Sequence, residues 1–198
     1  MKNVKIRQAN EEDSATVARL IYSTELVPED VWGGTTKEEC LKNLEELILA
    51  EKSKYNINYI TVAERFGKVV GAIVIIPHEE LERLSITTDL KVMSNFKGVK
   101  DKIWFIIDCI KLMICGECQK GELYISNVAT SPSVRGLGVG KLLMDYAQTI
   151  AEKDEYYGIS LLAKDEEVSR FYKKLNYETK FDKVLLGERF IRMAKCVQ

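Results

Sequence analysis

The feature that most constrains the fold of this chain is a glycine-rich segment, residues 134–144, with glycines at positions 136, 138 and 140. Glycine adopts backbone conformations with positive φ and has no side chain, so such a segment forms a loop that a ligand can approach closely. A strand pattern precedes the loop, and apolar residues at helical spacing follow it from Val139. The sequence therefore predicts that a strand, a tight loop and the start of a helix meet at one point.

The start of a helix presents unpaired backbone N–H groups and the positive end of the helix dipole, and both favour a phosphate group. Arg135 and Lys141 add positive charge on either side of this point. Two common phosphate-binding loops do not fit the segment. The Walker A loop needs Ser or Thr where this chain has Leu142, and the dinucleotide-binding loop needs a different glycine spacing. A glycine-rich turn without any ligand is the alternative interpretation.

The first half of the chain predicts the order strand, helix, helix, strand, strand. An alternating pattern begins near the N-terminus, and Asn10 followed by acidic residues predicts a helix start. Thr36, with a glutamate three residues later, predicts the start of a second helix. Two β-branched runs, 59–65 and 69–76, are separated by a short turn and predict a hairpin. For 198 residues we expect a single domain, 1–198.

Residues 79–121 are predicted to form an insertion between the third and fourth strands. Its second half contains an apolar run, 103–114, which is too short to span a membrane and is interrupted by Asp108 and Lys111 at a spacing that allows an ion pair. A helix this apolar must cover something. It could pack on the sheet, close over the substrate site, pair with a second copy of the chain in a homodimer, or lie on a membrane surface. We expect this insertion to decide substrate choice.

The second half of the chain predicts a fourth strand at 122–130 and a fifth, parallel strand at 158–163. Simple alternation would place Tyr124 and Val128 on one side of the fourth strand and Ile125 and Ala129 on the other. A helix follows with one apolar face, and two closing strands are predicted at 181–186 and 190–196. The expected fold class is α/β, with a mixed sheet of about seven strands and helices on both faces.

Charge and cysteine content narrow the environment and the partners. The formal net charge of −1 gives no support for a nucleic-acid or membrane partner. The N-terminus lacks the apolar core of a signal peptide, and five cysteines, an odd number, favour reduced thiols, so we expect a cytoplasmic protein. Cys115 and Cys118 have the spacing of a metal-binding pair, but no second pair accompanies them, so we expect no metal.

The residues of the loop resemble the pyrophosphate loop of the GNAT superfamily of N-acetyltransferases, whose pattern is Arg/Gln-x-x-Gly-x-Gly/Ala. Arg135, Gly138 and Gly140 fall on this pattern. The later segment Phe171-Tyr172, which is followed by Asn176 and Tyr177, resembles the family's Phe-Tyr-x-x-x-Gly-Phe signature, with asparagine in place of glycine. Asn176 follows an amphipathic helix, so we expect it to adopt the left-handed conformation of a helix C-cap. The resemblance covers the second half of the chain well and the first half only by element order. It implies a GNAT-like acyl-CoA N-acyltransferase fold with a helical insertion.

The resemblance also implies a cosubstrate, acetyl-CoA, and the residues that hold it. The pyrophosphate would lie on the loop, which comprises Arg135, Gly136, Leu137, Gly138, Val139, Gly140 and Lys141. The pantetheine arm would lie along Val128, Ala129 and Thr130, where the fourth strand separates from the fifth, and beside Phe171. Thr130 and Asp165 depart from the residues usual at their positions, and Asp165 puts one pantetheine contact in doubt.

Two catalytic residues follow from the same resemblance. Tyr172 would donate a proton to the departing CoA thiolate. Glu122 stands thirteen residues before Arg135, the offset of the general-base glutamate in histone-acetylating members, and the alternative is a strand-end glutamate in solvent. A base is needed because an alkylamine, with a pKa near ~10, is mostly protonated at neutral pH.

The expected function is therefore transfer of an acetyl group from acetyl-CoA to a primary amine, by direct attack while both reactants are bound. The acceptor is expected to be a small-molecule amine or a protein amine. Two other classes stay open at this point: an acyl-CoA-binding regulatory module without turnover, and a scaffold that binds a partner through the apolar insertion.

Overall fold

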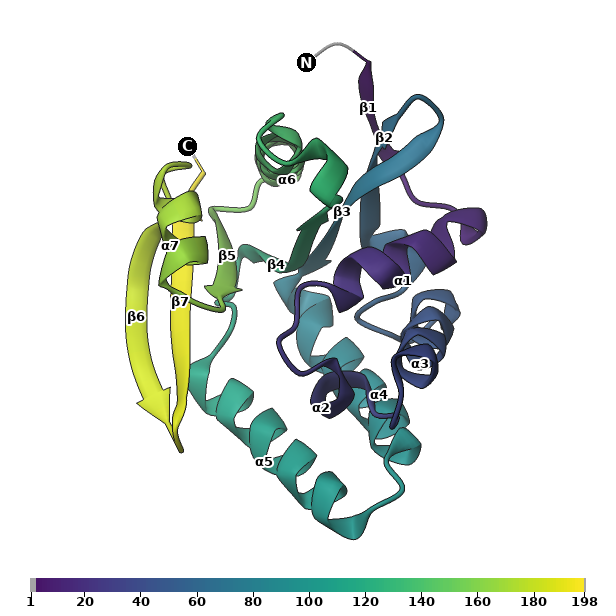
Figure 1. Cartoon of the computed structure of the whole chain (residues 1–198). Helices are drawn as coiled ribbons and strands as arrows, with labels where there is room; N and C mark the ends of the chain where they lie inside the picture. The colour runs from purple at the N-terminus through teal and green to yellow at the C-terminus, as the bar shows by residue number, and fades with distance from the viewer. Residues whose placement is uncertain (1–2, 198) are drawn as a thin grey trace.

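The computed structural model describes residues 3–197, which form a seven-stranded mixed sheet in the order β1-β2-β3-β4-β5-β7-β6 (Figure 1). All neighbouring strands are antiparallel except β4 and β5, which are parallel as predicted. The strands are β1 (Val4–Gln8), β2 (Ile60–Arg65), β3 (Lys68–Pro77), β4 (Glu122–Thr130), β5 (Gly158–Ala163), β6 (Glu178–Leu185) and β7 (Glu188–Cys196). The predicted fold class and the predicted mixed sheet are confirmed.

Helices cover both faces of the sheet, again as predicted (Figure 1). One face carries the first five helices and the other carries the last two. The helices are α1 (Ser14–Tyr22), α2 (Pro28–Trp32), α3 (Lys37–Leu49), α4 (His78–Asn95), α5 (Val99–Cys115), α6 (Val139–Lys153) and α7 (Glu166–Lys173). Among the residues described, no helix is both long enough and apolar enough to cross a membrane.

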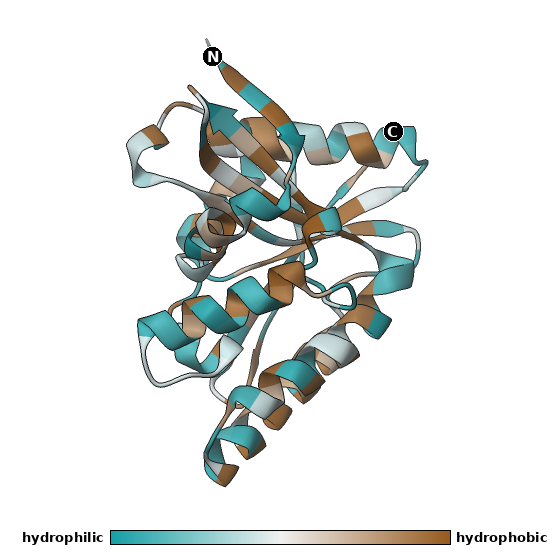
Figure 2. Cartoon of the chain, turned by 90° about the vertical axis from the view of Figure 1, so that its right-hand side faces the viewer, coloured by the Kyte–Doolittle hydropathy of each residue, from teal (hydrophilic) through white to brown (hydrophobic). Residues whose placement is uncertain are grey.

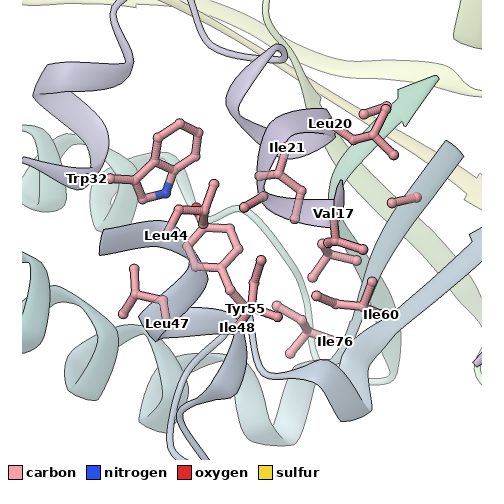
Figure 3. Packing of buried hydrophobic residues seen from close by; sticks show 14 of the residues in the cluster. Val17, Leu20, Ile21, Trp32, Leu44, Leu47, Ile48, Tyr55, Ile60 and Ile76 are labelled. Carbon is pink, nitrogen blue, oxygen red and sulfur yellow. The ribbon is translucent and has the colours of Figure 1, made fainter. Parts of the chain in front are cut away.

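Each face of the sheet has its own apolar core. Under α1 to α5, Val17, Ile21, Trp32 and Leu44 belong to one apolar cluster, and all four side chains are buried (Figure 3). On the other face Leu143 of α6 packs over β3 and β5. Hydrophobic segments run through the strands, while the helices carry a mixture of hydrophobic and hydrophilic residues (Figure 2). Burial of these apolar surfaces is the main force that fixes the helices on the sheet.

The alternation predicted for β4 is wrong beyond Ser126. Ile125 pairs with Ile75 of β3, but Asn127 pairs with Val74, so Ser126 is an extra residue and forms a β-bulge. As a result, Ile125 and Val128 both face α6, whereas Ala129 faces α1. A bulge arises from strand pairing, and the apolar pattern of one strand does not reveal it.

Residues 79–121 form two helices between β3 and β4 rather than one. The predicted apolar helix is α5, and the predicted ion pair is present, with Lys111 Nζ 2.6 Å from Asp108 Oδ1. The other helix, α4, was not predicted because its apolar pattern is weak. Its buried residues, Leu81, Leu84, Thr88 and Val92, nevertheless recur at steps of three or four, which gives it one face against the core.

Candidate active site

The glycine-rich loop joins the end of β4 to the start of α6. A short 3₁₀ turn, Pro132–Val134, leads into it, and Gly136 and Gly138 both have φ of +76°, a conformation that favours glycine. The sequence predicted that all three glycines lie in the loop, but Gly140 lies in the first turn of α6. The chain therefore turns at Gly136 and Gly138, and Gly140 is part of the helix that follows.

Five backbone N–H groups at this point have no hydrogen-bond acceptor within residues 3–197. They belong to Gly136, Gly138, Val139, Gly140 and Lys141. Such groups, gathered at the N-terminus of a helix, form a binding site for an anion. By contrast, the N–H groups of Arg135 and Leu137, which the sequence also assigned to the loop, already donate to the carbonyl oxygens of Pro132 and Val134.

The charged side chains of the loop are exposed. Arg135 extends from the turn that precedes the free amides, and no ion pair engages it in the described part of the chain. Lys141 Nζ, in the first turn of α6, lies 2.6 Å from Asp145 Oδ2, one helical turn further on. Arg135 is therefore the freer of the two cations that flank the amides.

Three parts of the chain that are distant in sequence converge at Gly140. A methyl group placed on Gly140 would lie 3.6 Å from Phe171 Cζ of α7 and 3.9 Å from Thr130 Cγ2 at the end of β4. The two segments that carry the sequence motifs therefore lie next to one another at the start of α6. The structure brings Thr130, Gly140 and Phe171 together.

The strands β4 and β5 separate beside the loop. They pair only over Glu122–Ile125 and Gly158–Leu161, while β4 continues to Thr130. Val128, Ala129 and Thr130 therefore have β3 on one side and no strand partner on the β5 side. This opening begins at the bulge at Ser126 and ends at the loop, so the bulge directs the end of β4 away from β5.

Tyr172 lies on α7 with its side chain buried. The rings of Phe171 and Tyr177 are 5.2 Å and 5.8 Å from it, centre to centre. Burial raises the pKa of the Tyr172 phenol above its ordinary value, because an apolar environment disfavours the phenolate. The phenol is therefore protonated at neutral pH, and because burial also makes it a weaker acid, donation of its proton depends on its position at the acceptor atom.

Glu122 occupies a different environment from either sequence interpretation. Its carboxylate is buried, forms an ion pair with Arg192 of β7, and accepts a hydrogen bond from the backbone N–H of Gln119 at 2.8 Å. A carboxylate already neutralised by a buried arginine is a poor acceptor for the proton of a substrate. Arg192 was missed by the sequence analysis, although a lone arginine between apolar residues of a strand was a signal for a buried partner.

A second glutamate lies near the bulge of β4 and was not predicted. Asn127 Nδ2, just after the bulge, donates to Thr24 Oγ1 at 3.0 Å, and Thr24 Oγ1 lies 3.2 Å from Glu25 Oε1. Glu25 also lines a surface cavity of about 390 Å³ together with Arg19, Tyr22 and Pro28. The carboxylate is half-buried and stands on the sheet face opposite to α6. Its position in an irregular loop left no pattern in the sequence.

The two departures from the family signature have structural explanations. Asp165 is the N-cap of α7, where its Oδ1 accepts a hydrogen bond from the backbone N–H of Val168 at 2.7 Å. Asn176 has φ of +67°, the left-handed conformation that the sequence analysis predicted for it. Both residues therefore define the ends of the helix that carries Phe171 and Tyr172.

Comparison with known proteins gives a family match and a set of similar structures. Residues 100–179 match the family described as Acetyltransferase (GNAT) domain. No curated protein sequence matches the chain. An N-acetyltransferase from Staphylococcus aureus Mu50 is 21% identical, with a TM-score of 0.70 over 96% of this chain and all of the other.

Two further structures share the fold over nearly the whole chain. A crystal structure described as an acetyltransferase is 19% identical, with a TM-score of 0.68 over 98% of this chain and all of the other. A polyamine N-acetyltransferase from Drosophila melanogaster, which forms N-acetylagmatine, is 13% identical, with a TM-score of 0.67 and the same coverage. At these identities the likeness establishes the shared fold, and the family match covers the loop, α6 and all of α7.

Proposed function

Since the chain belongs to the GNAT superfamily and is an acyltransferase, we propose that it transfers the acetyl group of acetyl-CoA to a primary amine while both substrates are bound. One observation carries this proposal: five free backbone N–H groups at the start of α6 lie beside the opening between β4 and β5. A diphosphate and a long, narrow arm are the two parts of coenzyme A that such a site suits.

The loop would hold the diphosphate, and the opening would hold the arm. Gly136, Gly138, Val139, Gly140 and Lys141 offer their N–H groups, and Arg135 adds a positive charge that no other residue of the described chain neutralises. Val128, Ala129 and Thr130 line the opening with backbone that β5 leaves unpaired. Phe171 closes the site from the side of α7, beside Gly140.

The chemistry needs orientation, a proton acceptor and a proton donor. An N–H near Val128 would stabilise the negative charge that develops on the thioester oxygen. As the amine nitrogen bonds to the carbonyl carbon, the carbon–sulfur bond breaks, and Tyr172 would give its proton to the departing sulfur. The phenol is already held in its protonated form by burial. Binding both substrates in the correct geometry supplies much of the rate without any covalent intermediate on the protein.

We assign the proton acceptor to Glu25 rather than to Glu122. The acceptor amine must enter from the sheet face opposite to α6, and Glu25 stands on that face beside the bulge and at a surface cavity. Glu122 is buried and paired with Arg192, so accepting a proton would leave a buried arginine without its counter-ion. Glu25 would take the proton of the ammonium group directly or through one water molecule.

A small, positively charged amine is the acceptor that we propose. Glu25 is the acidic residue that lines the cavity, where Arg19 and Lys37 also lie, so its carboxylate is the group that an ammonium would approach. The polyamine acceptor of the similar Drosophila enzyme agrees with this choice. A protein amine is the second candidate, because the site lies at the surface.

Thiol release from acetyl-CoA, measured across a panel of polyamines, arylalkylamines and peptides, tests the proposal. We expect release that depends on a small amine and disappears in the Gly140→Trp variant. Binding of CoA without release with any amine would identify a regulatory module instead. Failure to bind CoA would leave only the scaffold interpretation.

A further inference from the structure

One face of α5 is apolar and exposed along its whole length. Val99, Ile103, Ile106, Ile110 and Met113 lie on this face, with between 44% and 75% of each side chain accessible. The opposite face is fixed to the protein, because Phe105 is buried against Phe96, and Lys111 pairs with Asp108 and Glu188 of β7. The helix therefore has one side anchored by Phe105 and Lys111 and one bare face, while Trp104, which is 53% exposed, lies outside that bare face. We call the bare set of five residues the α5 seam.

The spacing of the α5 seam is that of a helix that pairs with another helix. The five residues follow one another at steps of four, three, four and three. This alternation keeps side chains in one straight line, as in coiled-coil a and d positions, and differs from the broader stripe of a helix packed on a sheet. At 1.5 Å per residue the seam is about 21 Å long, four helical turns. Valine, isoleucine and methionine are suitable residues for such contacts.

We propose that the α5 seam is a homodimer interface, in which α5 of a second copy lies antiparallel across a two-fold axis. In that arrangement Ile106 meets its own copy, Ile103 meets Ile110, and Val99 meets Met113, so every seam residue finds an apolar partner. A two-fold axis at Ile106 produces these contacts, because the seam extends seven residues from Ile106 in each direction, to Val99 and to Met113.

The charges at the two ends of α5 favour the antiparallel direction. Lys100 and Lys102 flank one acidic residue, Asp101, at the start of the helix, so a net positive charge lies at the positive end of the helix dipole. The last turn carries no basic residue, and Glu117 follows it. Antiparallel pairing would place the lysines of each copy beside the negative helix end and Glu117 of the other. A parallel pair would instead bring the four lysines together.

The exposed area is sufficient for a reversible dimer. With Ile114, which borders the α5 seam and is 69% exposed, the apolar surface amounts to on the order of 600 Å² per chain, at the upper limit for a monomer and near the ~800 Å² per partner of a standard interface. Polar groups around the seam would add to the buried area. We therefore expect a dissociation constant in the micromolar range.

Sedimentation velocity of the full-length chain, from low to high micromolar concentration, tests this interface. We expect a dimer whose dissociation constant rises at least tenfold in Ile106→Glu, with an unchanged thermal midpoint, because that side chain is exposed in the monomer. Ile86→Glu is the matched control: Ile86 is 55% exposed on α4 and should leave the dimer intact. A monomer at every concentration, or a dimer unaffected by Ile106→Glu, would overturn the proposal.

A mixing experiment tests the direction of the helices. Val99→Glu and Met113→Lys should each weaken the dimer, and an equimolar mixture should restore it, because the two new charges meet only in the antiparallel pair. No recovery in the mixture would refute that arrangement.

The wild-type chain is also mixed with phosphatidylcholine–phosphatidylserine vesicles, and a monomer that binds them through the seam would assign α5 to a membrane instead. These experiments measure the mass of the protein and its binding to vesicles, so their outcome does not depend on whether the protein transfers acetyl groups.

Discussion

Substitution of Gly140 tests whether the glycine-rich loop binds a diphosphate or is only a turn. Gly140 has ordinary helical geometry, and a methyl group there would lie 3.6 Å from Phe171 and 3.9 Å from Thr130, which is normal contact distance. Alanine therefore fits without movement, and its higher helix propensity opposes any loss of stability. A tryptophan ring is far larger, and it would extend into the space over the free amides.

The size of the effect follows from the hydrogen bonds at risk. Hydrogen bonds to a charged group contribute about 1.5–3 kcal/mol each. If Gly140→Trp displaces the diphosphate from two or three of the five amides, the loss is at least ~3 kcal/mol, or more than about a hundredfold in affinity, at 1.4 kcal/mol per factor of ten. Gly140→Ala should remain within a few-fold of the wild type.

Calorimetric titration with CoA measures these affinities, and thermal unfolding shows that each variant is folded. Thr149→Trp is the control, because Thr149 is exposed on the same helix and away from the loop. A folded Gly140→Trp variant with wild-type affinity for CoA would show that the amides at the start of α6 do not hold the diphosphate. Loss of binding in Gly140→Ala would show that the geometry around Gly140 is tighter than the structure indicates.

Three further predictions concern the proton donor and two ion pairs. Tyr172→Phe should lower kcat on the order of tenfold or more with little change in CoA affinity, and unchanged steady-state kinetics would remove Tyr172 from the mechanism. Glu122→Gln should lower the free energy of unfolding by about 3–5 kcal/mol, since it leaves Arg192 buried and unpaired; urea unfolding checks this, and equal stability would contradict it. Arg7 lowers the pKa of Asp13, so their pairing stabilises the fold at neutral pH, and this stability is lost as pH falls through the depressed pKa. Asp13→Asn should therefore cost roughly 1–2 kcal/mol at pH 7 and nothing in strong acid, whereas an equal cost at both pH values would be inconsistent with the ion pair.

The sequence determined the local elements and the loop, because their signals are short-range. Apolar spacing predicted β4, β5 and α5, and the left-handed conformation of Asn176 followed from its place after an amphipathic helix. The glycine positions predicted the turn into α6, since few other residues adopt positive φ at low cost. The pair formed by Asp108 and Lys111 was predictable because both residues lie on one helix, three positions apart.

The tertiary structure decided what depends on contacts between distant segments. The bulge at Ser126 comes from the register of β4 against β3, and it inverted the predicted faces of the residues that follow it in the strand. Glu122 is neutralised by Arg192, seventy positions later in the chain, which no local pattern could show. The sequence also could not show which face of α5 would stay bare, because an apolar run does not reveal which of its residues the rest of the chain covers.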